Sequence, residues 1–366
     1  MKKYVLLIII PFLFCSFLQN SIPQEKTENE TVTLLFSGDI MGHSPQFKTA
    51  YNSETNSFNY DICFEHVKKI IKSVDFAVAN LEVPIAGKPY SGYPRFSSPD
   101  ALLDGLKNAG YDILLTANNH ALDRGKSGLE RTIRQIEKRN LYHLGTYMDK
   151  NQRDSIYPLI VENKGLKIAI LNCTYGTNDN VVTEPNYINL IDTTEIKHDI
   201  HKADSLGAGF KIMTIHWGTE YELNANNYQR KIAQFFVNQG INLIIGSHPH
   251  VVQNAELLYN KDSVQVPVFY SLGNSISNQR NINTDGGIMV KVEIDVKTAK
   301  IVNSCFVPVY VYRGTLNGEY QYHLIPTSEY HSFPILFPLS NSDSITLNLF
   351  DSNIKHRLNN ISNCVL

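Results

Sequence analysis

The sequence TANNHALDRG, Thr116 to Gly125, follows the apolar run 111–115 and precedes a helical pattern. It predicts a turn at the carboxyl end of a strand, which is where open α/β sheets build their sites. Asn118, Asn119, His120 and Asp123 can each hold a metal ion or an oxyanion, whereas an ordinary turn needs one capping oxygen and a glycine. The alternative is an Asn- and Asp-rich turn in which Asp123 caps the next helix. Recurrence of the pattern along the chain favours a site.

Short apolar runs alternate with helical patterns on both sides of this turn. The runs lack polar alternation, which is typical of strands that are covered on both faces. Ser98 is the expected cap of a helix over 98–110, and Asp192 with Glu195 is an expected reciprocal cap. The expected strands are 32–36, 75–82, 112–116, 141–144, 167–172, 211–215, 242–245 and 266–270, with helices over 61–73, 98–110, 129–136, 192–203 and 232–239. This alternation predicts an α/β domain built from βαβ units, a sheet core with flanking helices.

The texture of the sequence changes from Gly286 onward. GIMVKVEIDV and AKIVNSCFVPVYVY alternate in part and carry no helical pattern, so they predict an antiparallel hairpin with its turn near Lys297-Thr298. Residues 313–366 are expected to form a C-terminal extension, with one short helix over 352–358.

The amino terminus is of a different kind from the rest. Lys2 and Lys3 precede an apolar run over 4–18, which is shorter than the roughly 20 residues that span a bilayer. This predicts a signal peptide over 1–20, a polar linker over 21–31, and export to the bacterial periplasm or cell surface. A lipid-modified Cys15 and an uncleaved anchor remain alternatives, so membrane association through the N-terminus stays open.

Composition and cysteine content limit the classes of function. The 366 residues carry a net charge of -2 and no long basic run, which excludes nucleic acid as an expected partner. The even number of cysteines after the signal peptide permits disulfides in an exported protein, although Cys63, Cys173, Cys305 and Cys364 show no close pair. Cys63 and Cys173 lie in apolar patterns and are expected to be small buried hydrophobic residues.

Polar side chains recur wherever an apolar strand ends. The set is Asp39, His43, Asn80, Glu82, Asn118, Asn119, His120, Asp123, His216, Glu220, His248, His250 and Asn274. Because the carboxyl ends of parallel strands lie along one edge of a sheet, we expect these side chains to converge on one crevice. The set holds five of the 12 histidines.

Imidazoles, carboxylates and an Asn carbonyl are mixed nitrogen and oxygen ligands that suit Mn, Fe or Zn. Enough of them are present for two divalent ions, which together can hold the attacking and leaving oxygens of an in-line phosphoryl displacement. His120 is the candidate acid for the leaving group. The alternatives are a polar loop residue for His43, a turn residue for Asn274, and structural partners for Glu82 and His216.

The ordered motifs FSGDIMGH, ANLEVP, TANNHALDRG, IHWGTEY, GSHPHVVQ and YSLGN, over 33–274, resemble the poly-gamma-glutamate capsule synthesis (CapA-like) family. That family is similar to the calcineurin-like metallophosphoesterases. The resemblance implies a layered, metallophosphoesterase-like sheet core, which we place over 32–312.

The resemblance also implies roles for individual residues. Asp39 and His250 would hold a first metal, Glu82 would replace a bridging aspartate, Asn119, His216 and His248 would hold a second metal, and His120 would be the acid. We assign Asp123 to the catalytic group with His120, and His43, Asn80, Asn118, Glu220 and Asn274 to substrate binding. The chain departs from the phosphoesterase pattern at Asp39-Ile40-Met41, where a histidine is expected unless His43 substitutes, and at Asn80-Leu81-Glu82 in place of G-D-x-x-D.

Two functions from different classes follow. The first is an exported metal-dependent hydrolase of a phosphoester or related bond in an envelope polymer. The second is a non-catalytic accessory protein that holds an anionic capsule polymer such as poly-gamma-glutamate during export. A sugar-cleaving carboxylate pair, Glu82 and Glu220, is a third and weaker hypothesis.

Overall fold

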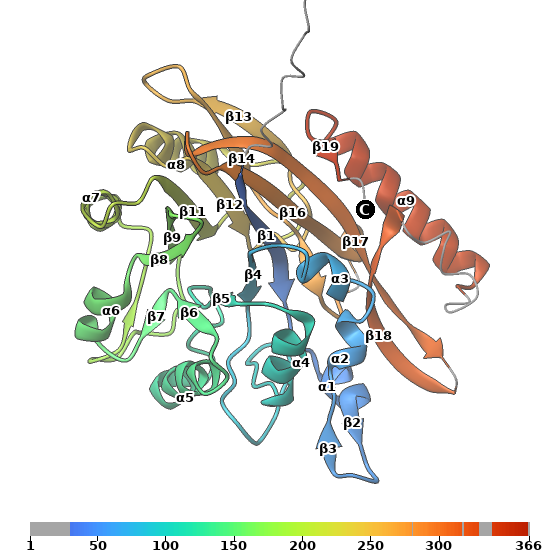
Figure 1. The fold of residues 1–366 in the computed structure, drawn as a ribbon. Coiled ribbons are helices and arrows are strands. Elements are labelled where there is room, and N and C mark those ends of the chain that lie inside the picture. Colours follow the sequence, from blue (N-terminus) through green and yellow to red (C-terminus); the bar gives the residue numbers. More distant parts are fainter. Residues whose placement is uncertain (1–29, 280, 317, 329–338, 365–366) are drawn as a thin grey trace, which may run out of the picture.

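The computed structural model describes residues 30–279, 281–316, 318–328 and 339–364. Two sheets dominate this part of the chain (Figure 1). The first sheet has the order β18-β17-β16-β1-β4-β5-β6, with β15 and β19 attached; the second has the order β13-β14-β12-β11-β9-β8.

The first sheet consists of β1 (Thr31–Ile40), β4 (Phe76–Leu81), β5 (Ile113–Leu115), β6 (Tyr142–Leu144), β15 (Asn274–Ile276), β16 (Gly286–Asp295), β17 (Lys300–Leu316), β18 (Glu319–Pro326) and β19 (Ser362–Asn363). The second consists of β8 (Leu159–Asn163), β9 (Leu166–Thr174), β11 (Phe210–His216), β12 (Leu243–Ser247), β13 (Ala255–Tyr259) and β14 (Gln265–Phe269). Two short ribbons, β2 (Tyr51–Asn52) with β3 (Ser57–Phe58) and β7 (Thr146–Tyr147) with β10 (Tyr187–Ile188), complete the strands described.

Both sheets combine parallel and antiparallel strands: the parallel strands form one half of the first sheet and the centre of the second. In the first sheet β1, β4, β5 and β6 run parallel, while β16 to β18 add antiparallel strands. In the second sheet β9, β11, β12 and β14 run parallel, and β8 and β13 are antiparallel edges. The expected convergence at one edge of a single sheet is therefore wrong in one respect, because the strand ends belong to two sheets.

The buried residues of β1 explain why the apolar runs lack polar alternation. Val32, Leu34 and Phe36 belong to a core cluster that also contains the second sheet, including Ile170. Leu35, on the opposite face, belongs to a second cluster with helical residues. Both faces of the strand are covered, one by a sheet and the other by helices.

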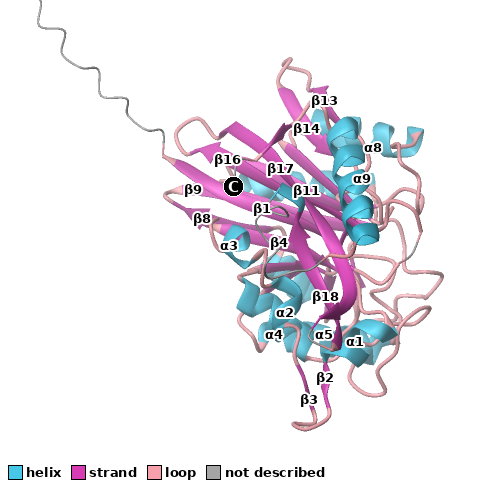
Figure 2. Cartoon of the chain, turned by 90° about the vertical axis from the view of Figure 1, so that its right-hand side faces the viewer, coloured by secondary structure: helices cyan, strands magenta, loops and turns pink. Residues whose placement is uncertain are grey.

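Helices cover the outer faces of the two sheets (Figure 2). They are α1 (Ser44–Ala50), α2 (Asp61–Phe64), α3 (Lys68–Ile71), α4 (Ala101–Ala109), α5 (Gly125–Glu137), α6 (Lys150–Ile156), α7 (Thr193–Ser205), α8 (Asn227–Asn238) and α9 (Asn341–Arg357). Phe64 of α2 and Leu106 of α4 pack on the first sheet, while Ile200 of α7 and Phe236 of α8 pack on the second. The layered α/β architecture with flanking helices is thereby confirmed.

Three details of the helices differ from expectation. The helix expected over 61–73 is two short helices, α2 and α3, separated by 65–67. Ser98 does not cap α4, whose N-cap is Asp100, and the buried Ser98 hydroxyl has no partner among the described residues. Asp192 does cap α7, accepting from two backbone N–H groups, but the Glu195 side chain accepts from the Tyr187 hydroxyl instead of completing a reciprocal cap.

The predicted C-terminal hairpin is confirmed and is larger than expected. β16 and β17 pair as antiparallel strands around a turn over 296–299, and β17 continues past 312 to Leu316, so the boundary placed there falls inside a strand. The helix expected over 352–358 is the much longer α9, which runs alongside β17 (Figures 1 and 2) and packs Phe350 against Tyr310. Exposed Ile345 and Leu349 obscure the apolar pattern that a helix usually shows.

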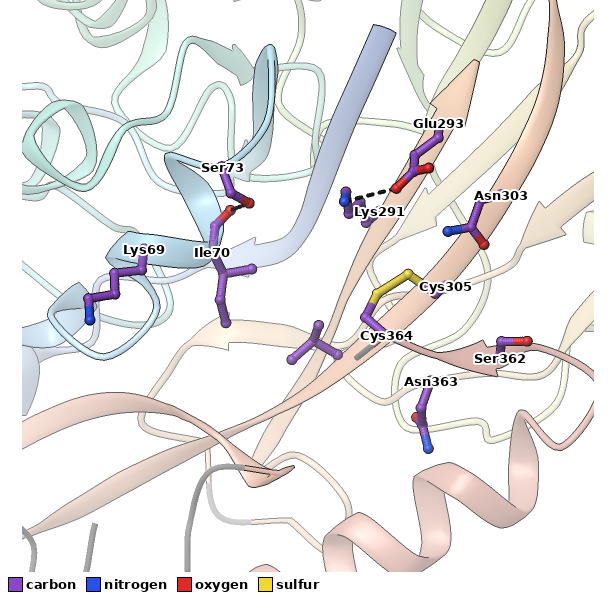
Figure 3. A pocket seen from close by; sticks show the side chains of 11 residues that line it. Lys69, Ile70, Ser73, Lys291, Glu293, Asn303, Cys305, Ser362, Asn363 and Cys364 are labelled. Atoms are coloured by element: carbon purple, nitrogen blue, oxygen red, sulfur yellow. Dashed lines mark hydrogen bonds and ion pairs between the residues drawn. A yellow bond between two sulfur atoms is a disulfide. The ribbon is translucent and has the colours of Figure 1, made fainter. Parts of the chain in front are cut away.

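Cys305 and Cys364 form a disulfide that ties the end of the chain to β17, across 59 residues of sequence. It borders a pocket of about 570 Å³ between α3, β16–β17 and β19 (Figure 3). Cys63 and Cys173 are free buried thiols, as expected, and burial raises the pKa of Cys63 to about 12.

The predicted signal peptide, 1–20, and the linker as far as residue 29 lie outside the described residues. Thr31, which was expected to end the linker, begins β1. No helix in the described part of the chain has both the length and the apolar composition needed to cross a bilayer.

Candidate metal centre

The carboxyl ends of strands from both sheets meet around a cluster of buried carboxylates and imidazoles. Two groups stand out, in each of which one ligand atom per residue lies within 4.8 Å of the others. The first group is Asp39, Glu82 and His250, and the second is Glu82, His216 and His248. Glu82 belongs to both groups. The arrangement has the form of two adjacent cation sites with a shared carboxylate.

The first group joins the end of β1 to the turn after β12. His250 Nδ1 lies 3.1 Å from Asp39 Oδ2, and His250 Nε2 lies 3.7 Å from Glu82 Oε1. The second Asp39 oxygen accepts a 2.8 Å hydrogen bond from Asn80 Nδ2. Asp39 and Glu82 are completely buried, so their charges need compensation by nearby groups or by a cation.

The second group joins the segment after β4 to the end of β11 and the turn that follows β12. His216 Nε2 lies 3.4 Å from Glu82 Oε1 and 2.9 Å from Asn119 Oδ1, so Asn119 adds an amide oxygen to this group. The rings of His216 and His248 have centroids 4.7 Å apart. Both histidines of the H-P-H turn have positive φ, 99° at His248 and 57° at His250, and their ring centroids lie 6.1 Å apart.

The polar atoms left without partners test whether these residues suit a metal. Three buried atoms of the centre have no hydrogen-bond partner among the described residues: both carboxylate oxygens of Glu82 and the Nδ1 atom of His248. Buried polar atoms in native proteins are almost always paired, and a lone carboxylate is among the most costly exceptions. Divalent cations bound to both Glu82 oxygens would remove this deficit, so the donor set fits Mn, Fe or Zn.

Burial and mutual charge perturb the pKa of every member of the cluster. Burial, reinforced by Asp39, raises the pKa of Glu82 well above its usual value. Burial alone would lower the pKa of His250, but the charges of Glu82 and Asp39 raise it to about 9. Burial lowers the pKa of His216 to about 3 and that of His248 well below its usual value. Neutral imidazoles at these two positions are in the form that binds metals.

His120 and Asp123 form a buried pair beside the two groups. His120 Nδ1 lies 2.8 Å from Asp123 Oδ2, and the same oxygen accepts a 2.8 Å hydrogen bond from the Phe96 backbone N–H. The Phe96 ring packs edge-on against His120, with centroids 4.7 Å apart. Asp123 is therefore not a helix cap, and α5 begins after Arg124 without a side-chain cap. Asp123 orients the imidazole and leaves Nε2 free of this bond.

The structure places the other predicted site residues around this centre. Asn118 donates to the Leu81 carbonyl and Asn274 donates to the His250 carbonyl, so both amides brace the ligand turns. His43 belongs to neither group; it begins α1 and contacts Gln46 and the Phe96 ring. Glu220 is exposed, and its charge contributes to raising the pKa of both Glu82 and His250. None of the predicted residues lines the pocket of Figure 3.

Several residues at the centre were not predicted from the sequence. Tyr175 follows the end of β9, and its ring stacks parallel to His216 at 6.3 Å. Ser247 Oγ lies 3.0 Å from His216 Nδ1, and Asn178 accepts a hydrogen bond from Asn119. The strand-end rule applied to β9 would have found Tyr175. No sequence signal marks Phe96 or Asn178, which approach from loops.

The fold and the centre define a class: a two-sheet α/β protein with a buried nitrogen- and oxygen-donor site at the carboxyl ends of its parallel strands. Residues 33–279 match the model of the family described as "Bacterial capsule synthesis protein PGA_cap". The chain belongs to this family, and the predicted family relationship is confirmed.

The named relatives are capsule proteins. The chain is 26% identical over 306 residues to the capsule biosynthesis protein CapA of Bacillus anthracis, covering 80% of this chain and 71% of the relative. It is 26% identical over 295 residues to the PGA biosynthesis protein CapA of Bacillus subtilis (strain 168), covering 78% and 74%.

Solved structures with a partly similar arrangement include two nucleotidases. The NAD nucleotidase of Haemophilus influenzae is 12% identical, with 90% of this chain and 67% of that chain covered and a TM-score of 0.49. The 5'-nucleotidase of Candida albicans is 12% identical, with 89% and 56% covered and a TM-score of 0.43. At these scores the similarity supports no inference about activity.

Proposed function

We propose that this chain is an exported, metal-dependent hydrolase that acts on a phosphoester or related bond in envelope or capsule polymer metabolism. The observation that carries the proposal is Glu82, a fully buried carboxylate that belongs to two ligand groups and whose oxygens have histidine nitrogens nearby but no hydrogen bond among the described residues. A purely structural role would give those oxygens hydrogen bonds. Two cations sharing one carboxylate are a common arrangement for phosphoryl transfer.

We assign the ligands according to the two groups. Asp39, Glu82 and His250 would hold one ion, and Glu82, Asn119, His216 and His248 would hold the other. Bound ions would supply Lewis acidity and charge stabilisation for attack at phosphorus. Asn80, Asn118 and Asn274 position these ligands through hydrogen bonds, and His43 contacts the Phe96 ring; we assign all four to substrate binding.

His120 is the proposed proton donor to the leaving oxygen. Its Nδ1 is held by Asp123, which fixes the ring orientation and leaves Nε2 available for proton transfer. Asp123 is itself fixed by the Phe96 N–H, so the pair is preorganised before substrate binds. Loss of His120 should slow turnover without removing the metal.

The experiment measures metal content and hydrolysis of a chromogenic phosphoester by the purified chain. Wild-type protein should carry a divalent metal and release the chromophore. His120→Ala should keep its metal and lose turnover by about 100-fold or more, the usual contribution of general acid catalysis. His201→Ala, an exposed histidine on α7, is the matched control and should behave as wild type.

The second function is that of an accessory protein that binds an anionic capsule polymer such as poly-gamma-glutamate. The two CapA relatives are named for capsule biosynthesis and PGA biosynthesis, which favours a polymer of this kind as the biological context. Metal-free protein that binds the polymer and hydrolyses no phosphoester would support this function and overturn the first.

A further inference from the structure

Three exposed tyrosines lie near the metal centre, in contact with its histidines or with Phe96. Tyr93, Tyr175 and Tyr221 come from the loops after β4, β9 and β11, and are 75%, 44% and 41% exposed. We call these residues the tyrosine rim. The Tyr175 ring centroid lies 4.7 Å from that of His248, and the Tyr221 ring centroid lies 6.4 Å from that of His250. Two exposed aromatic rings therefore lie next to candidate ligand histidines.

Tyr221 is held in place by an unfavourable backbone. Its φ of 67° lies in the left-handed region, which a bulky residue rarely adopts. Its N–H donates a 2.8 Å hydrogen bond to the Pro249 carbonyl, within the H-P-H turn. Strained residues of this kind concentrate at functional sites, and here the strain turns the ring toward His250.

An exposed carboxylate belongs to the same surface as the tyrosine rim. Glu220 directly precedes Tyr221 in the loop after β11 and, like the three tyrosines, is exposed. Tyrosine side chains are uncharged at physiological pH, since the reference pKa of the phenol is about 10. Uncharged aromatic faces beside a carboxylate attract cations.

Resting on the proposed function, we propose that the tyrosine rim and Glu220 bind an ammonium group on the leaving alcohol of the phosphoester. Aromatic rings with a nearby carboxylate recognise quaternary and primary ammonium ions by cation–π and charge attraction. The phosphoryl group, which is anionic, would lie inside at the metal centre, and the cationic end would lie outside at the rim. A polyanion such as poly-gamma-glutamate meets the opposite charge pattern.

The reaction implied is an ordinary hydrolysis. The oxygen of water bonds to phosphorus, the bond from phosphorus to the leaving oxygen breaks, and that oxygen takes a proton from His120. The proton lost by the attacking water passes to solvent, and solvent reprotonates His120. The products are inorganic phosphate and an amino alcohol. No oxidant, reductant or further reactant is needed.

A matched pair of probes separates charge from shape. Phosphocholine carries the cation, and 3,3-dimethylbutyl phosphate is its neutral isostere. We expect kcat/KM to be about tenfold higher for phosphocholine, since a cation–π contact with a carboxylate at a half-exposed site is of this order. In Glu220→Gln and in Tyr221→Leu this preference should fall to about unity. Glu222→Gln, an exposed carboxylate on the same loop, is the control and should keep it.

A binding measurement distinguishes failure of this inference from failure of the proposed function. Line broadening of the choline methyl protons reports binding without turnover, and 3,3-dimethylbutanol is its neutral control. If Glu220-dependent binding of choline is seen but neither phosphoester is hydrolysed, the inference stands and the proposed function fails. If both phosphoesters are hydrolysed equally by wild type and Glu220→Gln, and choline does not bind, the inference is overturned and the function stands.

Discussion

The two sheets contribute different chemistry to the metal centre. The first sheet and its loops supply oxygen donors, namely Asp39, Glu82 and Asn119, whereas the second sheet and the turn after β12 supply the imidazoles His216, His248 and His250. Neither sheet alone offers a complete site. A bound cation would therefore tie the two sheets together, and metal binding should be coupled to the stability of their packing.

The strongest test of this comparison removes the residue on which both groups depend. Glu82→Gln keeps the shape of the side chain and removes its charge. We expect phosphoester hydrolysis to fall by more than about 1000-fold, since bound cations are worth several kcal/mol at the transition state. Bound metal measured by mass spectrometry should fall as well.

The stability of metal-free protein sharpens the same test. An unpaired buried carboxylate is destabilising, so metal-free Glu82→Gln should melt no lower than metal-free wild type. Glu162→Gln, on the exposed side of β8, is the control. A Glu82→Gln protein that retains wild-type metal content would contradict the shared-ligand assignment.

How far the sequence predicts this arrangement depends on the kind of contact. Apolar runs predicted the strands but not their division into two sheets. Leu34 packs against the second sheet and Leu35 packs against helices, yet both are leucines in one apolar run. A strand face covered by a sheet and one covered by helices have the same apolar sequence pattern, so the sequence could not predict the division of donors between two sheets.

The centre itself was more predictable than its surroundings. Asp39 and His216 lie at the carboxyl ends of β1 and β11, and Glu82 directly follows β4. The strand-end rule places such residues together. The Cys305–Cys364 disulfide was not predictable, because it depends on β19 pairing with β17 across 59 residues. Phe96 comes from a loop with no periodic pattern, and its contact with His120 depends on tertiary structure alone.

The disulfide links two segments of the first sheet, whereas a bound cation would link the two sheets to each other. Replacing Cys305 and Cys364 with Ser opens a loop of 59 residues, and the chain-entropy model predicts a loss of about 4 kcal/mol in unfolding free energy. Metal content should not change, because both cysteines lie outside the two ligand groups. Denaturant unfolding with parallel metal analysis measures both. If the variant lost bound metal as well as stability, the disulfide and the metal centre would not be independent.

Metal removal tests the tie between the sheets directly. Dialysis against a chelator should lower the unfolding free energy by about 3 kcal/mol relative to protein held at 100 times the metal dissociation constant. The corresponding fall in Tm is about 5 °C. Differential scanning calorimetry measures it, and restoring the metal should restore the Tm. An unchanged Tm would mean that the sheets pack equally well without a cation.

The smallest effect concerns a buried histidine outside the centre. Burial lowers the pKa of His323, on β18, to about 4, against 6.5 in the unfolded chain. Between these values the unfolded state binds more protons than the folded state, so His323 destabilises the fold progressively as pH falls from about 6.5 toward 4. At pH 5 the loss should be about 1 kcal/mol after allowance for solvent screening. His323→Gln should lose less stability than wild type between pH 8 and pH 5, while the exposed His201→Gln should match wild type. Equal losses in all three proteins would show that His323 is not the source of the acid sensitivity.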